Sequence, residues 1–117
     1  MDGIEIRIGN YIYLVDRKKI WEIRNGFEID MIQADKMAIP ISLTTEWLQS
    51  FGLRKDMKGV WCFRYSQYGV FRLFSDDGDS FYFMTATTRK PIKDVHVLQN
   101  LFYAITGEEL KILKNAD

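Results

Sequence analysis

Apolar and polar residues alternate along the first third of the chain in the manner of short β-strands. Residues 10–16 are rich in β-forming side chains, and residues 20–24 and 27–32 alternate with a period of two. Asn25-Gly26 separates the last two runs, and this dipeptide between β-rich runs favours a type I′ hairpin turn. Three short strands bury little surface alone, so we expect them to curl into an SH3-like partial barrel or to lean on the rest of the chain.

A short helix is predicted near the middle of the chain. Thr44 is a suitable N-cap, because its hydroxyl can accept a hydrogen bond from a free amide of the first turn. Gly52 is well placed to end the helix in the left-handed conformation. Between these two residues, Trp47, Leu48 and Phe51 recur at helical spacing, so this helix should pack by its aromatic side.

Three aromatic-rich runs, at residues 59–66, 68–75 and 79–86, predict a three-stranded antiparallel meander. Each run alternates large apolar side chains with smaller or charged ones, as a half-buried strand does. This alternation places Phe71 and Leu73 together on the buried face of the sheet.

The strongest helical pattern lies near the end of the chain, with Asp94 as N-cap and Gly107 as the left-handed stop. At about 100° per residue, one half of this helix is apolar and should pack on the sheet. This half comprises Val95, Val97, Leu98, Leu101, Phe102, Ala104 and Ile105. The tail at residues 109–114 can add a strand at the sheet edge, protected by Lys111 and Lys114.

The other half of the same helix gathers His96, Gln99, Asn100 and Tyr103, which are neighbours at i, i+3 and i, i+4 spacing. A solvated face would usually carry Lys and Glu, so these uncharged groups suit a half-buried place where hydrogen bonds are made. Three interpretations stay open: contact with a loop or the N-terminal strands, a binding surface with Trp47 as an aromatic neighbour, and catalysis by His96. Catalysis has little support, because no nucleophile motif or carboxylate pair lies at useful spacing.

Length and composition set the class of the fold. The chain has 117 residues, enough for a single domain over residues 1–117, with 47% hydrophobic and 27% charged residues. We therefore predict an α+β domain. It should contain short N-terminal antiparallel strands, a short helix, a three-stranded meander and a C-terminal helix packed on the sheet.

The charge balance disfavours one class of function. Lys+Arg and Asp+Glu are equal at 16 each, whereas a nucleic-acid binder usually shows a basic excess because its affinity comes from phosphate neutralisation. A local patch stays open as an alternative, since Arg64 and Arg72 on an aromatic sheet could hold phosphates while exposed rings stack bases.

No metal or cofactor site is predicted. Asp76, Asp77 and Asp79 surround Gly78, but their spacing suits a hairpin turn rather than an EF-hand loop. Cys62 is the only cysteine, so it forms no internal disulfide and is expected to be a small buried hydrophobe. The sequence has no signal-peptide pattern at its start and no apolar run long enough to span a membrane, so we expect a cytoplasmic protein.

Three stretches resemble motifs of one family: IRIGNYIYL at residues 6–14, IPISLTTEWLQSFGL at residues 39–53 and VHVLQNLFYAITGEELKI at residues 95–112. The family consists of small uncharacterised proteins from gut-dwelling anaerobic bacteria, their prophages and other mobile elements. The matching positions are Arg7, Gly9 and Asn10; Pro40, Leu43, Thr44, Trp47 and Leu48; His96, Leu98, Gln99, Asn100, Leu101 and Phe102; and Thr106 to Leu110. The resemblance covers nearly the whole chain and implies an origin in a phage or mobile element, but no particular activity.

These observations predict a non-enzymatic accessory or protein-interaction module of a phage or mobile element. Its expected site is the polar half of the last helix, and its expected partner is a protein. The alternative is a nucleic-acid-binding module that uses an aromatic sheet with Arg64 and Arg72.

Overall fold

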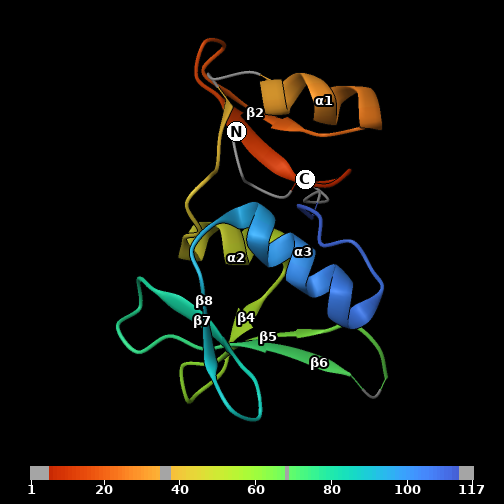
Figure 1. Ribbon diagram of the computed structural model, residues 1–117. Coiled ribbons are helices and arrows are strands. Elements are labelled where there is room, and N and C mark those ends of the chain that lie inside the picture. The colour runs from red at the N-terminus through yellow and green to blue at the C-terminus, as the bar shows by residue number, and fades with distance from the viewer. Residues whose placement is uncertain (1–5, 35–37, 68, 114–117) are drawn as a thin grey trace.

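The computed structural model describes residues 6–34, 38–67 and 69–113, and their fold is α+β as the sequence predicts (Figure 1). The helices of the described residues are α1 Gly26–Ala34, α2 Thr45–Phe51 and α3 Val95–Thr106. Their strands are β1 Tyr11–Leu14, β2 Lys19–Glu22, β3 Ala38–Ile39, β4 Arg54–Lys55, β5 Trp61–Arg64, β6 Val70–Leu73, β7 Phe81–Met84 and β8 Arg89–Ile92. Figure 1 shows α2 and α3 in the middle of the molecule, with β1, β2 and α1 on one side and β4 to β8 on the other.

The first sheet has the order β2-β1-β3, and its pairs are antiparallel. We call this sheet and α1 the N-terminal lobe. Successive side chains of β1 point to opposite faces, so Ile12 and Leu14 enter a small core within the lobe while Tyr11 enters the main core. The small core comprises Ile6, Ile12, Leu14, Ile23, Ile32 and Ala38. Because β1 contributes to both cores, it ties the lobe to the rest of the protein.

Residues 27–32, predicted as a strand after an Asn-Gly hairpin turn, are instead helical. Asn25 caps α1, because its Oδ1 accepts a hydrogen bond from the Glu28 backbone N–H at 2.9 Å. The Glu28 carboxylate accepts in return from the backbone N–H of Arg24 at 2.8 Å, an arrangement close to a capping box. These bonds favour a helix start over a type I′ turn. The lobe is thus a sheet with a helix packed against it, in place of the partial barrel suggested by the sequence.

The second helix forms where the sequence predicts it. The Thr44 hydroxyl accepts a hydrogen bond from the Trp47 backbone N–H at 3.3 Å, and Gly52 ends the helix with a φ of 96°. A Cβ atom at Gly52 would lie 2.6 Å from the side chain of Leu113. The backbone conformation therefore favours glycine here, and a larger residue would also have to displace the exposed Leu113 side chain.

The three strands of the predicted meander are present, but they belong to two sheets. β5 pairs with β6 and with β4, whereas β7 pairs with β8. A bridge between Phe74 and Tyr82 joins β6 to β7. Phe71 and Leu73 are buried as predicted. The sequence did not predict β8, because its residues, RKPI, are charged and include a proline.

The last helix begins after Asp94 and ends at Gly107, which has a φ of 76°, as predicted, although the Asp94 side chain forms no capping hydrogen bond. Phe102 is buried, and its ring centroid lies 5.2 Å from that of Phe71, so α3 packs on the sheet. The inward face is rotated from the predicted apolar half, since Ile105 at its edge is 42% exposed.

The segment after α3 forms no strand in the part of the chain that the structure describes. Its Leu110 side chain is buried, and the backbone N–H of Leu113 donates to the carbonyl oxygen of Ser50 at 2.8 Å. The segment therefore passes the end of α2 and does not extend a sheet edge. Lys114, predicted to protect that edge, lies outside the described residues.

Candidate functional site

The polar half of α3 is not an open surface. His96 and Gln99 are 1% and 0% exposed, Asn100 is half-buried, and Tyr103 is 43% exposed. The structure therefore corrects the idea of a binding face for His96 and Gln99, which no partner could reach. It shows the alternative arrangement, in which this side of the helix contacts the N-terminal strands.

Gln99 uses its whole side-chain amide inside the protein. Its Oε1 accepts from the backbone N–H of Tyr11 at 2.9 Å, and its Nε2 donates to the carbonyl oxygens of Gly9 at 2.8 Å and Leu110 at 3.0 Å. A buried backbone group without a partner is costly, so these bonds are more valuable than surface bonds. One side chain thus joins three segments that are far apart in sequence. We call the contact of α3 with residues 7–11 the polar joint.

Asn100 and Arg7 extend the polar joint towards the surface. The Oδ1 of Asn100 accepts from Nδ2 of Asn10 at 2.9 Å and from Nε of Arg7 at 3.1 Å. Arg7 also forms an ion pair with Glu109, and its guanidinium lies 4.3 Å from the centroid of the Tyr103 ring. Asn100 and Tyr103 therefore belong to the same internal network as Gln99.

Trp47 packs beside the polar joint without closing a site over it. Its ring centroid lies 5.7 Å from that of Tyr11 and 5.6 Å from that of Phe51. The predicted aromatic neighbour is thus a half-buried part of the main core wall.

His96 is buried, and its Nδ1 has no hydrogen-bond partner among the described residues. Burial lowers the pKa of the imidazole below its ordinary value, and the Asp94 carboxylate opposes this with a smaller effect. The side chain is therefore neutral at pH 7, but its burial keeps any substrate out of its reach, so it does not suit the role of a general base.

Acidification should destabilise the protein through His96. In the unfolded chain the imidazole titrates near pH 6.5, whereas burial holds the folded pKa lower. Below about pH 6.5 the unfolded state binds a proton that the folded state does not. The free energy of unfolding should then fall by up to about 1.4 kcal/mol per pH unit until the folded pKa is reached. Urea unfolding at about pH 7.5, 6.5 and 5.5 measures this slope.

The control for that slope is His96→Leu, because the chain has one histidine. Carboxylates titrate well below this pH range, so the variant should show a nearly flat dependence between about pH 7.5 and 5.5. A slope as steep as that of the unmodified protein would show that another group is responsible.

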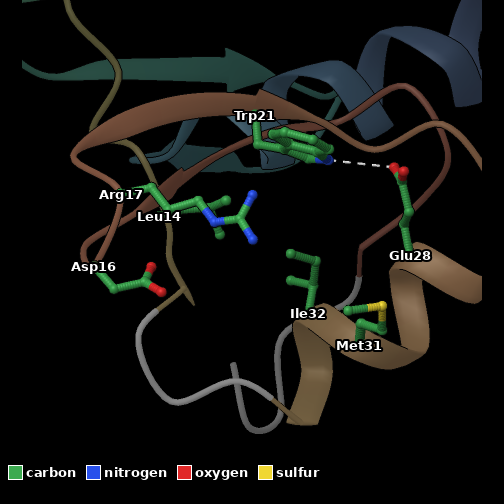
Figure 2. Close-up of a pocket in the computed structure, with 7 residues that line it drawn as sticks. All are labelled: Leu14, Asp16, Arg17, Trp21, Glu28, Met31 and Ile32. Carbon is green, nitrogen blue, oxygen red and sulfur yellow. Dashed lines mark hydrogen bonds between the residues drawn. The ribbon is translucent and has the colours of Figure 1, made fainter.

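A cavity of about 160 Å³ lies in the N-terminal lobe, between α1 and the hairpin of β1 and β2 (Figure 2). Figure 2 shows the Trp21 ring on one side, Ile32 and Met31 of α1 on the other, and Arg17 reaching between them. The full lining is Leu14, Asp16, Arg17, Trp21, Glu28, Met31 and Ile32. We call this cavity the anchor pocket.

The charged groups of the anchor pocket are held differently on its two sides. On one side the Trp21 Nε1 donates to Oε1 of Glu28 at 3.2 Å, and Arg24 donates two bonds to Oε2 of Glu28 at 3.0 and 2.7 Å. These bonds lower the pKa of Glu28 to about 2, so the carboxylate is charged at neutral pH. On the other side, Arg17 has no ion pair among the described residues. The pocket therefore offers an unpaired cation beside apolar walls.

Exposed apolar side chains surround the same lobe. Phe27 and Met31 lie one turn apart on α1 and are 73% and 57% exposed. On the sheet, Tyr13 lies between Ile20 and Ile39, which are 48% and 43% exposed. Exposed apolar side chains that lie next to one another often mark an interaction site, whereas scattered single ones do not.

The acidic turn at residues 76–80 is stabilised by hydrogen bonds from its own backbone to Asp77. The Oδ1 of Asp77 accepts from the backbone N–H groups of Asp79 at 2.9 Å and Ser80 at 2.8 Å, as the turn prediction requires. Within the described ranges, no three His, Cys, Asp or Glu side chains are grouped to hold a metal ion. Cys62 is half-buried rather than buried.

The comparisons with known proteins do not indicate a function. The chain matches no family model, no curated protein and no solved structure. None of the helices among the described residues has the length and apolar character needed to cross a membrane. The polar joint and its ion pair bring together residues from the predicted first and third motifs: Arg7, Gly9, Asn10, Gln99, Asn100, Glu109 and Leu110.

Sequence reasoning missed the anchor pocket, because it assigned residues 27–32 to a strand. The sequence also contained a helical signal here, because Ile29 and Ile32 are three residues apart and Phe27 and Met31 are four apart. In the structure the first pair faces the small core and the second pair lies on another side of the helix. On that interpretation, two large apolar residues remain exposed on a short helix.

Proposed function

We propose that this protein is a non-enzymatic interaction module that binds a segment of a partner protein at its N-terminal lobe. The observation that carries the proposal is the anchor pocket, a cavity with apolar walls beside the exposed Phe27 and Met31. Protein interfaces draw most of their affinity from a few large side chains that fill such pockets.

The size of the anchor pocket favours a single side chain as its occupant. A cavity of about 150 Å³ is large enough to hold benzene, and the anchor pocket measures about 160 Å³. A leucine or phenylalanine side chain of the partner therefore fits. Phe27 and Met31 would cover the flanks of the inserted segment and exclude water from it.

The charges around the pocket favour particular residues next to the apolar side chain of the partner segment. The turn between β1 and β2 carries Arg17 and Lys18, and β2 begins with Lys19, against one acid of the turn, Asp16. The other acid of the lining, Glu28, is paired with Arg24, so this side of the rim is positive. We infer that the partner segment carries an acidic residue next to its apolar anchor. Such pairs steer association and fix the register of the bound segment.

The resemblance to proteins of prophages and mobile elements supports an accessory role in such an element. The burial of His96 supports a non-catalytic role, because a buried imidazole cannot exchange protons with a substrate.

The test is a selection of peptides from a displayed random library against the whole protein. Enriched peptides should share an apolar anchor beside an acidic residue and should bind with micromolar affinity. Met31→Glu should weaken them at least about tenfold, because it places a charge at the rim of an apolar pocket (about 1.4 kcal/mol or more). Binding is measured by isothermal calorimetry.

The matched control is Met57→Glu, which adds the same charge at a fully exposed methionine far along the chain. It should leave the peptide affinity unchanged. Failure to enrich any peptide, or equal losses in the two variants, would contradict the assignment of the anchor pocket.

A further inference from the structure

We propose that the face of β4, β5 and β6 that points away from α3 binds single-stranded nucleic acid. This face carries Arg54, Arg64 and Arg72, and β6 continues into the stacked rings of Phe74 and Tyr82. We call it the arginine face. It is a different surface from the anchor pocket, so the inference goes beyond the proposed function.

The arginine face is free because the helices lie on the other side of the sheet. The rings of Phe63 and Phe71 meet Phe102 of α3, with centroids 5.4 and 5.2 Å apart. Figure 1 shows α2 and α3 on that side of β5 and β6. The alternating side chains, which include the three arginines, therefore point to solvent.

Strand register brings the three arginines together. Arg54 pairs with Cys62, and Cys62 pairs with Arg72, so the three residues form a row across the sheet. Because neighbouring strands lie about 4.8 Å apart, the Cα atoms of Arg54 and Arg72 are about 10 Å apart. Arg64 lies two residues beyond Cys62 on β5, about 7 Å along the strand and on the same face. The arginines thus form a triangle of a size that successive phosphates can span.

None of these arginines takes part in an ion pair within the residues that the structure describes, and all three are exposed. Arg64 donates one hydrogen bond, to the carbonyl oxygen of Gln67 at 3.3 Å. Like charges gathered on one small face repel one another, and a bound polyanion removes that repulsion. The guanidinium group is also the side chain best shaped to hold a phosphate with two hydrogen bonds.

Two carboxylates lie at the arginine face and offset only part of its charge. The Oδ1 of Asp56 accepts from the backbone N–H groups of Lys58 at 2.8 Å and Val60 at 3.0 Å. Asp76 pairs with Arg89, with 2.9 Å between Oδ2 and Nη1. Asp56 stays charged, and its Oδ2 lies 4.0 Å from Sγ of Cys62, between Arg54 and Arg72. Asp76 is balanced by Arg89, so among the described residues three unpaired arginines face one unpaired carboxylate and leave the face positive although the whole chain has zero net charge.

The aromatic end of the face distinguishes a nucleic acid from an acidic peptide. Phe74 and Tyr82 are stacked, with centroids 5.8 Å apart and ring planes at 21°. The Arg89 guanidinium lies 4.5 Å from the centroid of the Tyr82 ring. Unpaired bases stack on aromatic rings and on guanidinium planes. A peptide lacks such bases, and a duplex has its bases already stacked, so a single strand uses this platform best.

The test is fluorescence anisotropy with the full chain and a labelled oligothymidylate of about 15 nucleotides. Contact with three phosphates predicts a slope of about −2 for log affinity against log salt, which is a loss of about 20-fold between 50 and 200 mM salt. The variant R54Q/R64Q/R72Q should weaken binding at 50 mM salt at least about tenfold and flatten the slope. The control R17Q/K18Q/K19Q removes the same number of charges from the N-terminal lobe and should bind like the unmodified chain.

Three results would overturn the assignment. The first is no detectable binding of oligothymidylate at 50 mM salt, and the second is an equal loss in the two charge variants. The third is equal affinity for an abasic strand of the same length or for polyglutamate, since either would show that bases are not recognised. A duplex of the same length should bind more weakly than the single strand in a parallel assay, because its bases are already stacked.

Discussion

Replacing Gln99 with alanine is expected to lower the free energy of unfolding by about 3–5 kcal/mol. The side chain is 0% exposed and forms three hydrogen bonds with backbone groups of Gly9, Tyr11 and Leu110. Removing it leaves those groups buried without partners, at about 1–3 kcal/mol each before any water enters the gap. Since domains of this size have about 5–15 kcal/mol in total, the melting temperature should fall by roughly 10–20 °C. Urea unfolding followed by circular dichroism measures the loss.

Gln49→Ala is the matched control for that loss. Gln49 is also a helical glutamine, but it lies on the exposed side of α2. Its replacement should change the free energy of unfolding by less than about 0.5 kcal/mol. If the two variants were equally stable, Gln99 would not hold the polar joint together.

Replacing Phe102 with alanine is expected to cost about 3–5 kcal/mol by a different mechanism. The ring is 1% exposed and touches the rings of Phe63, Tyr65 and Phe71, with centroids 5.4, 6.2 and 5.2 Å away. Its loss removes apolar burial and opens a cavity where α3 meets the sheet. Edge-to-face contacts between aromatic rings add to that cost. Urea unfolding of the two proteins, fitted with one common slope of free energy against urea concentration, gives this loss.

Phe27→Ala removes the same side chain from an exposed site. Phe27 is 73% exposed on α1, so this change should leave the free energy of unfolding within about 0.5 kcal/mol. It should nevertheless weaken peptides that bind at the anchor pocket. A large loss of stability in Phe27→Ala, or a small loss in Phe102→Ala, would contradict the assignment of the main core.

The last two helices could be predicted from sequence because most of their ends carry local signals. Thr44 and Gly52 act within one turn of α2, and Gly107 ends α3 as expected. Asp94 marks the start of α3, but its side chain forms no capping bond, and the Val95 backbone N–H donates to the carbonyl oxygen of Ile41 at 2.8 Å. The alternation along β5 and β6 was equally local, since it depends only on which side of each strand is apolar. Signals of this kind do not require knowledge of the rest of the chain.

The first helix could not be predicted in the same way, because two local signals conflicted. Asn25-Gly26 is a strong hairpin turn, and residues 27–32 alternate like a strand. Hydrogen bonds of Glu28 resolve the conflict in favour of the helix. Its carboxylate accepts from Arg24 and Trp21, which both precede the segment 27–32. A period of two over six residues is too short to outweigh those contacts.

The polar half of α3 shows what sequence alone leaves open about a site. The helical wheel placed His96, Gln99 and Asn100 away from the apolar half of the helix, but it could not show what they face, and the structure buries His96 and Gln99 together with Leu98 and Phe102. The partners of Gln99 and Asn100 lie about 90 residues away, at Gly9, Asn10 and Tyr11. Uncharged polar groups on a helix suit a buried joint as well as a binding surface. Only the fold distinguishes the two, and it moves the candidate sites to the anchor pocket and the arginine face.

The central claim is that Gln99 fastens the N-terminal lobe to the main core from within. Native-state hydrogen exchange of the Tyr11 amide tests it most directly, because this N–H donates to the Gln99 side chain at 2.9 Å. The Tyr11 amide should exchange only through global unfolding, with the same free energy as the buried amides in the middle of α3, and should lose that protection in Gln99→Ala. Exchange of the Tyr11 amide at the rate of a surface loop, while α3 stays protected, would contradict the claim.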